Sequence, residues 1–360
     1  MGRYITGLLQ ALEPLAHPTA PASPAFNLRP LFAPRGAARA VRRWVKLLPG
    51  SYALAEAARA AVLRQERAQG LSVYHETNHA APRFDGPVVL TVHDLSTLLH
   101  PETQEPGRVR HFSRALRLRA REATRVIVPT EAIGREVVQH LGVAPERVRP
   151  IHHGVDARFS PAPILASQAR EPRQSPGGYL LFVGALDPRK GLLTLLDAYD
   201  ALPARLSRAH PLLLAGPDDR ASPVLRKRLA ARRDGSIILS GYVSDETLVT
   251  LYRGAAAVCL PSIYEGFGLP LAEALACGVP SVASDDPALV EVAAGAALHF
   301  PRGDGHALCE ALERLLGDES LRADLSRKGL ARAAVFSWDA CAAQHLAVYR
   351  EAFETAGFAR

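Results

Sequence analysis

Short, almost wholly apolar runs recur along the chain, and amphipathic stretches separate them. The clearest runs stand at 88–92, 126–129, 179–183 and 211–215. Apolar runs of this length are typical of strands buried on both faces, as in parallel sheets. Between them apolar side chains recur at helical spacing, as do Leu192, Leu195, Leu196 and Tyr199. The pattern predicts an α/β chain in which helices cover parallel sheets.

The same pattern divides the chain into two regions. Residues 160–178 are rich in Pro, Ser, Ala and Gln and lack hydrophobic periodicity, which is typical of a linker. We therefore expect a first domain at 1–159, a second at 179–335 and a last helix within 336–360. The 360 residues, 48% of them hydrophobic, are enough for two separate cores.

One stretch of the second region combines a glycine loop with a helix start. Residues 262–280 read SIYEGFGLPLAEALACGVP, with Pro270 at a first helical position and Leu271 beginning an apolar face. We expect a helix from near Leu269. Its first amides carry the positive end of the helix dipole, and Gly266 and Gly268 let an anion approach the backbone closely. The stretch therefore predicts a phosphate cradle.

Two carboxylates bracket this cradle, Glu265 before the helix and Glu273 within it. A carboxylate does not bind phosphate, so both are expected to accept hydrogen bonds from hydroxyl groups. Phosphate flanked by hydroxyls indicates a nucleotide sugar. A capped surface helix is the simpler explanation for a lone junction of this kind. The choice between the two interpretations therefore depends on the other motifs of the chain.

The string from Glu265 to Pro280 resembles the signature of retaining glycosyltransferases of family 4, which have the GT-B fold. The resemblance implies two Rossmann-like domains facing each other across a cleft, with a C-terminal helix that crosses back to the first. It also implies that residues 1–159 serve the acceptor and residues 179–335 bind the nucleotide sugar.

The resemblance assigns roles to residues of the second domain. Glu265 would hold hydroxyls of the donor sugar, and Glu273 those of the ribose. Arg189 and Lys190, in a Pro-Arg-Lys-Gly turn, would neutralise the donor diphosphate; some members carry an arginine where this chain has Ala185. The full donor-binding set is Gly184, Arg189, Lys190, Tyr242, Val243, Glu265, Gly266, Phe267, Gly268, Leu269 and Glu273, with the base against Tyr242 and Val243.

A strand end in the first domain supplies further candidates. His93 and Asp94 close the apolar run at 88–92, where ligands of open α/β sheets bind. With Pro101 and Glu102 they resemble a segment of the mannosyltransferase-like members. An isolated histidine is more often structural, but at this position we expect His93 to line the sugar pocket. The predicted catalytic residues are His93, Asp94, Lys190 and Glu265.

The first residues resemble a helix start of the same family. Gly2, Arg3 and Tyr4 match the remnant of its glycine-rich loop and the helix that follows, whereas the family's first strand is apparently missing. We expect either a start codon placed too far downstream or an impaired chain.

The net charge of +7 lies in the first domain. Residues 1–160 hold 22 basic and 13 acidic side chains, a balance of +9, against 21 and 23, a balance of −2, in the rest. Two basic stripes recur at helical spacing. The predicted membrane or acceptor surface comprises Arg35, Arg39, Arg42, Arg43, Lys46, Arg110, Arg114 and Arg117. A solvated helix face explains such stripes as well as attraction to anionic lipid does; nucleic acid is a weaker choice because no reader motif accompanies them.

Arg189, Lys190 and the helix start at Gly266–Leu269 would supply fixed positive potential where charge develops on the leaving diphosphate, so we expect a metal-independent enzyme without a cofactor. No apolar stretch approaches the ~20 residues of a membrane span, so we expect a soluble or peripheral protein. The four cysteines show no metal or CxxC spacing and indicate free thiols in a reducing cytoplasm, and the basic first half favours the inner face of the membrane. The donor is expected to be GDP-mannose and the acceptor a glycan or polyprenyl-linked sugar. The alternatives are a UDP-sugar donor, an impaired transferase-like binding subunit, and a GT-B phosphorylase or sugar-nucleotide epimerase. The phosphorylase and the epimerase explain the Glu-Gly-Phe-Gly string less well than a glycosyltransferase does.

Overall fold

The structure is a computed structural model of the 360-residue chain, and it describes residues 2–16, 51–78, 81–104, 106–162, 177–232 and 234–357. The first basic stripe, Arg35, Arg39, Arg42, Arg43 and Lys46, lies outside these residues, as does most of the linker.

The described strands form two parallel sheets, as the apolar runs predict. The first has the order β1-β2-β3-β4: β1 (Tyr74–Glu76), β2 (Val88–Thr91), β3 (Arg125–Val128) and β4 (Val148–Pro150). The second has the order β10-β9-β8-β5-β6-β7: β5 (Tyr179–Val183), β6 (Leu212–Ala215), β7 (Ile237–Gly241), β8 (Ala255–Leu260), β9 (Ser281–Ser284) and β10 (Leu298–Phe300).

The order of the second sheet reverses between β5 and β8. From β5 the chain runs outward through β6 and β7, and from β8 it runs the other way through β9 and β10. Ligands of open α/β sheets bind at the carboxyl ends of strands at such a switch point. The segments that begin at Gly184 and Pro261, after β5 and β8, are therefore neighbours at the position where a ligand is expected.

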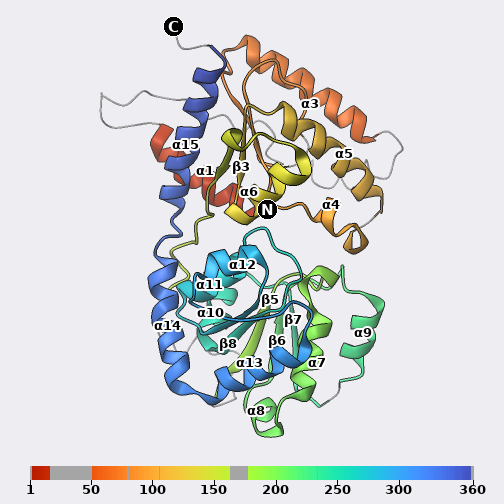
Figure 1. The fold of residues 1–360 in the computed structure, drawn as a ribbon, viewed down its shortest axis with the longest axis vertical. Helices are drawn as coiled ribbons and strands as arrows, with labels where there is room; N and C mark the ends of the chain where they lie inside the picture. Colours follow the sequence, from red (N-terminus) through yellow and green to blue (C-terminus); the bar gives the residue numbers. More distant parts are fainter. Residues whose placement is uncertain are drawn as a thin grey trace.

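Helices cover both faces of the first sheet, and its strands are therefore buried on both sides (Figure 1). Val89 and Ile127 pack under α1 and α15, whereas Leu90 and Val126 face α5 and α6. These helices and the smaller ones of this region are α1 (Gly2–Ala16), α3 (Ser51–Ala68), α4 (Ser96–Leu99), the 3-10 turn Pro101–Thr103, α5 (Pro106–Glu122), α6 (Glu131–Glu136), the π-turn Val137–Leu141 and the 3-10 turn Pro145–Arg147.

The second sheet is covered in the same way. On one face of the sheet, Leu180 and Phe182 pack in the core beneath α7 and α13. On the other face, Tyr179 and Leu181 pack in the core beneath α10 and α11. The elements are the 3-10 turn Pro188–Lys190, α7 (Leu192–Ala201), α8 (Ala204–Ala209), α9 (Pro223–Ala230), α10 (Asp245–Gly254), α11 (Leu269–Ala276), α12 (Pro287–Ala293), α13 (Gly305–Gly317) and α14 (Glu319–Ala333).

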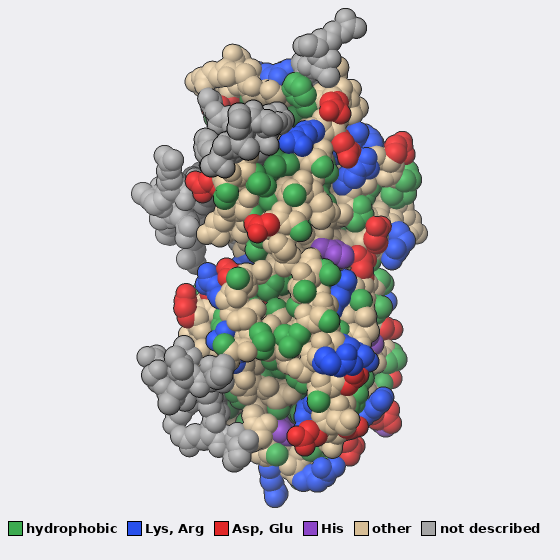
Figure 2. Space-filling view, turned by 90° about the vertical axis from the view of Figure 1, so that its left-hand side faces the viewer, with side chains coloured by type: hydrophobic (Ala, Val, Ile, Leu, Met, Phe, Trp, Pro, Cys, Tyr) green, Lys and Arg blue, Asp and Glu red, His purple; other side chains and the backbone are tan. Residues whose placement is uncertain are grey.

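The last helix, α15 (Trp338–Thr355), returns to the first domain, as expected (Figure 1). Its buried residues Ala342 and Val348 share a core with Tyr4 and Leu8 of α1. Gly154 makes this crossing possible, since a Cβ there would lie 2.4 Å from the amide nitrogen of Trp338. Figure 2 shows the face that carries the crossing, with hydrophobic side chains scattered over both halves.

Candidate active site

The predicted cations and the first predicted carboxylate meet at the switch point. Nζ of Lys190 lies 2.5 Å from Oε1 of Glu265, and Nη1 of Arg189 lies 3.5 Å from Oε2. Ser262 donates a further hydrogen bond of 2.8 Å to Oε1. All three charged side chains are largely buried. The sequence predicted Arg189 and Lys190 as ligands of the donor diphosphate but did not predict that they pair with Glu265.

The charges of this cluster depend on one another. Burial alone raises the pKa of Glu265, but Lys190, Arg189 and the hydrogen bonds to the carboxylate outweigh it and hold the pKa below its ordinary value. Burial lowers the pKa of Lys190, and Glu265 opposes this shift. The cluster therefore holds two cations beside one ionised carboxylate, a net positive charge.

Arg189 keeps a buried donor without a partner. Its Nη1 donates to the carbonyl of Tyr264 at 2.8 Å, whereas no described residue accepts from its buried Nε–H. Buried polar groups are usually hydrogen-bonded, so an unpaired donor marks a place for an acceptor of a ligand. The 3-10 turn Pro188–Lys190, which carries Arg189, is capped by Asp187, whose Oδ1 accepts from the Arg189 amide at 3.1 Å.

The loop after Glu265 leads into α11 as predicted. The helix begins at Leu269 with Pro270 in its first turn, and Gly268 has a φ of 82°, which favours glycine. No described residue offers an acceptor to the amides of Gly266, Phe267 and Gly268. The phenyl ring of Phe267 itself is buried, 4.9 Å from the ring of His153 and 5.6 Å from that of Phe336. Only the backbone of this residue is therefore placed to meet a ligand.

The same loop docks against the first domain. A Cβ on Gly266 would lie 1.9 Å from the carbonyl oxygen of His93, so Gly266 serves a close contact between the domains as well as an open backbone. The Thr130 hydroxyl donates to the Gly266 carbonyl at 3.0 Å. The hydroxyl of Tyr264 accepts from the Leu95 amide at 2.8 Å and donates to Glu136 at 2.6 Å. The site is thus built from both domains.

His93 and Asp94 lie at this boundary, after β2, as predicted. His93 Nε2 lies 3.0 Å from the carbonyl oxygen of Thr77, and its ring packs edge-on against Tyr4 with centroids 4.7 Å apart. Oδ1 of Asp94 accepts from the amide of Ser96 at 2.9 Å and from its hydroxyl at 2.6 Å, which fixes the turn into α4. The backbone carbonyl of His93 is the group that lies against Gly266 of the glycine loop.

Glu273 is almost fully buried within α11, at 1% exposure. Its Oε1 pairs with Arg3 of the first domain, and its Oε2 accepts from the Tyr252 hydroxyl at 2.9 Å. Burial raises the pKa of Glu273 to about 7, although Arg3 and the Tyr252 hydrogen bond oppose the rise. Arg3 was predicted only as part of a loop remnant with Gly2. The structure shows that it contacts Glu273.

The remaining predicted donor residues surround the same edge of the sheet. Gly184 follows β5, and its amide donates to the Ala215 carbonyl at 2.9 Å. Tyr242, after β7, is 82% exposed, whereas Val243 beside it packs against the core. The Tyr242 ring is therefore free to stack on a flat group.

Three further residues of the site were not predicted from the sequence. Asp286 accepts from the Glu265 amide at 3.3 Å and caps α12. Arg220 lies 2.9 Å from Asp187 and donates to Gln104 of the first domain at 3.1 Å. Ser262 anchors Glu265. The available signal was their position in the segments that follow β6, β8 and β9, because the carboxyl ends of parallel strands share one edge of the sheet.

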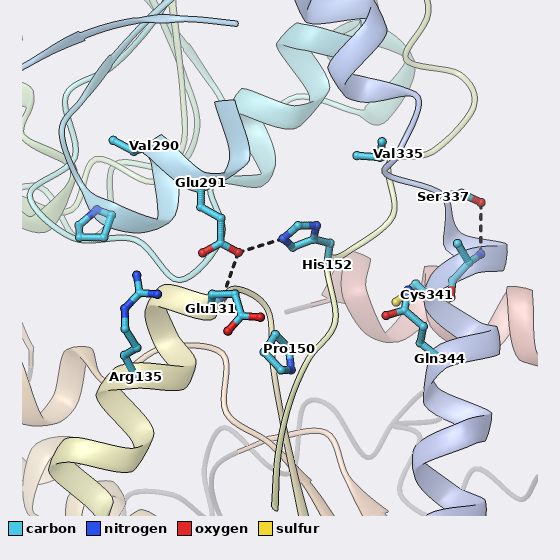
Figure 3. A pocket seen from close by; sticks show the side chains of 12 residues that line it. Glu131, Arg135, Pro150, His152, Val290, Glu291, Val335, Ser337, Cys341 and Gln344 are labelled. Atoms are coloured by element: carbon cyan, nitrogen blue, oxygen red, sulfur yellow. Dashed lines mark hydrogen bonds and ion pairs between the residues drawn. The ribbon is translucent and has the colours of Figure 1, made fainter. Parts of the chain in front are cut away.

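A pocket of about 690 Å³ opens between the domains on the crossover side (Figure 3). At its centre Glu291 accepts from the amides of Glu131 and Ala132 at 2.9 and 3.0 Å, and its Oε1 lies 3.0 Å from Nε2 of His152. The lining includes none of the predicted donor residues. This pocket is therefore separate from the candidate active site.

The second basic stripe lies on α5, on the flank of the first domain opposite α15 (Figure 1). Arg110, Arg114 and Arg117 are exposed, as predicted, and Nη1 of Arg117 donates to the His140 carbonyl at 3.2 Å. Among the described helices, none combines the length and apolar composition of a membrane span. The described residues contain no group of three or more potential metal ligands.

Comparison with known proteins identifies the family. The model for Glycosyltransferase Family 4 matches residues 1–159, and that for Glycosyl transferases group 1 matches residues 166–332. The O-antigen chain mannosyltransferase B of Escherichia coli is 32% identical over 282 residues, 77% of this chain and 74% of that protein. The serotype-specific mannosyltransferase WbdA of Escherichia coli is 28% identical over 291 residues, which cover 78% of this chain and 35% of WbdA.

Solved structures agree on the fold. Sucrose-phosphate synthase from Thermosynechococcus elongatus superposes with a TM-score of 0.72 at 23% identity, over 98% of this chain and 93% of that one. WaaG, a glycosyltransferase involved in lipopolysaccharide biosynthesis, superposes with a TM-score of 0.68 at 17% identity, over 96% and 95% of the two chains. The chain therefore belongs to glycosyltransferase family 4, as a mannosyltransferase-like member with the GT-B fold.

Proposed function

We propose that this glycosyltransferase moves mannose from GDP-mannose to a glycan or polyprenyl-linked acceptor during synthesis of a surface polysaccharide. One observation carries the proposal: Arg189 and Lys190 are held beside Glu265 and the open amides of the glycine loop. Two cations and a helix N-terminus suit a diphosphate, and the adjoining carboxylate suits sugar hydroxyls.

The chemistry follows from where charge develops. As the bond between the anomeric carbon and the diphosphate breaks, negative charge grows on the leaving group. Arg189, Lys190 and the first amides of α11 supply fixed positive potential at that place. The unpaired Nε–H of Arg189 is one donor that the diphosphate would satisfy. These groups make a metal unnecessary for neutralising the leaving group, so we propose metal-independent transfer.

We propose retention of configuration by attack on the same face from which the diphosphate leaves. The acceptor hydroxyl bonds to the anomeric carbon, and its proton passes to an oxygen of the departing phosphate. Glu265 would orient the hydroxyls of the donor sugar, and Glu273 those of the ribose. His93 and Asp94 would border the sugar from the first domain.

Mannose is favoured because relatives of this chain are mannosyltransferases by name, and because His93, Asp94 and Glu102 resemble that subgroup. The alternative donor is a UDP-sugar. A catalytically impaired binding subunit is the second alternative, and the buried Lys190–Glu265 pair argues against it.

The acceptor side is the first domain. Its exposed arginines on α5 suit a phosphate-linked acceptor or an anionic membrane surface. We therefore propose that the enzyme works in the cytoplasm, on the inner face of the membrane.

A panel of nucleotides tests the donor. We expect GDP and GDP-mannose to raise the melting temperature of the protein more than UDP and UDP-glucose do, because a ligand that binds the folded state stabilises it. The Lys190→Met variant should lose this shift, whereas Lys227→Met, which changes an exposed lysine on α9, should keep it. A larger shift with UDP would favour the alternative donor, and no shift with any nucleotide would contradict the proposal.

A further inference from the structure

Arg3 reaches across the boundary between the domains. Its helix α1 belongs to the first domain, where the Tyr4 hydroxyl lies 3.1 Å from Oγ1 of Thr91 and 2.9 Å from Nε2 of His345. The Arg3 guanidinium pairs with Glu273 and, at 2.6 Å, with Asp245, both in the second domain. The two domains are thus joined at the carboxylate that is expected to hold the ribose.

The surroundings of Glu273 offer little other support for a negative charge. Its ionisable neighbours are Arg3 from α1, Asp245 and Tyr252 from α10, and Cys277 at the end of α11. Arg3 is the only cation in this set. Burial holds the pKa of Glu273 near 7, so its charge at neutral pH depends on Arg3.

We propose that Arg3 is a positioning residue that acts through Glu273: it keeps the carboxylate ionised and oriented for the ribose hydroxyls of the donor. This inference rests on the proposed function, in which Glu273 holds the ribose. A carboxylate accepts hydrogen bonds at both oxygens, whereas a protonated carboxyl turns one of them into a donor. Donor affinity should therefore follow the ionisation of Glu273.

The same geometry links donor binding to the contact between the domains. Glu273 is covered in this arrangement, with one oxygen on Arg3 and the other on Tyr252. A ribose can reach it only after Arg3 or α1 gives way, and Arg3 can pair with it again once the ribose is in place. Arg3 thus contributes both the charge of the site and its closure.

The test measures the dissociation constant of GDP by calorimetry from pH 6 to pH 9. For the wild-type chain we expect GDP to bind more tightly as pH rises through about 7. In Arg3→Met the pKa of Glu273 rises further, so GDP binding at pH 7 should weaken, by roughly fivefold if that pKa rises by about one, because the ionised fraction of Glu273 then falls from about one half to about one tenth. The difference from wild type should shrink toward pH 9. Arg3→Lys keeps a cation and should restore most of the wild-type profile.

Two further variants separate this role from a purely structural one. Glu273→Gln should bind GDP weakly and without the pH dependence, and adding Arg3→Met to it should change little more. Arg158→Met is the matched control, because Arg158 lies 3.6 Å from Asp245 at the same boundary and no described contact joins it to Glu273. Its profile should match that of the wild type.

The outcomes discriminate clearly. Equal weakening by Arg3→Met at every pH, or the same midpoint shift in Arg158→Met, would overturn the inference. If Arg3→Met does not fold, Glu273→Gln carries the test, and a retained pH dependence in that variant overturns the inference. A wild-type chain that binds neither GDP nor UDP contradicts the proposed function and this inference together, whereas wild-type binding with an unshifted Arg3→Met profile contradicts the inference alone.

Discussion

Lys190 and Glu265 form a buried ion pair, with 2.5 Å between Nζ and Oε1, although 75 residues separate them in the chain. The order of the second sheet makes β5 and β8 neighbours, so the turn that carries Lys190 lies beside the loop that carries Glu265. Arg189 lies on the other oxygen of the same carboxylate. The cations are therefore fixed in place by the protein itself, which is the condition for electrostatic stabilisation of a transition state.

Removal of one partner tests the pair. Lys190→Met leaves Glu265 buried with weaker compensation, so we expect a loss of about 3–5 kcal/mol in the free energy of unfolding. The double variant Lys190→Met/Glu265→Gln removes both members of the pair, so its loss should be smaller than the sum of the losses in Lys190→Met and Glu265→Gln. Lys190→Met and the double variant should each lose at least ~100-fold in kcat/KM. Urea unfolding and donor turnover measure the two effects.

Lys227→Met serves as the control for this series, because Lys227 is exposed on α9. Its stability should stay within ~0.5 kcal/mol of wild type. If the losses of the two single variants simply add in the double variant, the pair is not the unit that we describe. If Lys190→Met turns over donor at the wild-type rate, its proposed role in transfer is wrong.

Local features of the fold were predictable from the sequence. Buried strands show as apolar runs because both faces of a parallel sheet are covered. The start of α11 at Leu269 and the cap of α6 by Thr130, which accepts from the Ile133 amide at 3.3 Å, follow from residue types at fixed offsets. The end of the apolar run at 88–92 likewise placed His93 and Asp94 at the carboxyl edge of the first sheet.

The partners of these residues were not predictable in the same way. Arg3 and Glu273 are 270 residues apart, and nothing in their local sequence specifies the contact. The glycine pattern predicted an approach to the backbone at Gly266 but could not show that the His93 carbonyl already lies there. Such contacts depend on how the two domains sit together, which no local periodicity encodes.

Gly266 tests that contact. In Gly266→Ala the new Cβ would lie 1.9 Å from the His93 carbonyl oxygen and 3.2 Å from Cβ of Asp94, so the domains must part locally. Overpacking of this kind costs about 1–3 kcal/mol, and we expect a lower melting temperature together with lower kcat. Gly317→Ala is the control, because no atom lies within 4 Å of its Cβ position. Unchanged stability and kcat in Gly266→Ala would contradict the close contact.

Tyr242 tests the position of the base. Its ring is 82% exposed, so Tyr242→Ala should change the free energy of unfolding by less than ~0.5 kcal/mol. Loss of stacking should weaken nucleotide binding by about 1–3 kcal/mol. Tyr242→Phe keeps the flat ring and should bind almost as the wild type does. Equal nucleotide affinity of Tyr242→Ala and wild type would show that the base binds elsewhere.

Chelation tests the proposal of metal-independent transfer. Because Arg189, Lys190 and the α11 amides are proposed to neutralise the leaving group, donor turnover after dialysis against EDTA should stay within about twofold of the untreated enzyme, a difference of under ~0.5 kcal/mol in the barrier. Added Mg²⁺ or Mn²⁺ should not raise it further. A large loss that Mg²⁺ restores would contradict the proposal.

Asp286 gives a prediction with a defined pH window. Burial and the charge of Glu265 raise its pKa to about 6, although hydrogen bonds from the amides of Leu289, Glu265 and Ala288 oppose this. Its pKa in the unfolded chain is about 3.9, so the folded state binds the extra proton between these values. The stabilising contribution of Asp286 is therefore fully present below about pH 4 and is lost as pH rises through about 6.

Asp286→Asn removes this titration and keeps an oxygen to accept from the start of α12. The substitution also turns part of the group into a donor, which adds an offset that does not vary with pH. We therefore compare the free energy of unfolding of the variant and the wild type at pH 4.5 and pH 7.5. The difference should move in favour of the variant by up to about 2 kcal/mol on going to the higher pH, because only the wild type must then bury a second carboxylate charge beside Glu265. A difference that stays constant, or that moves toward the wild type, would show that Asp286 is ionised in the folded state throughout this range.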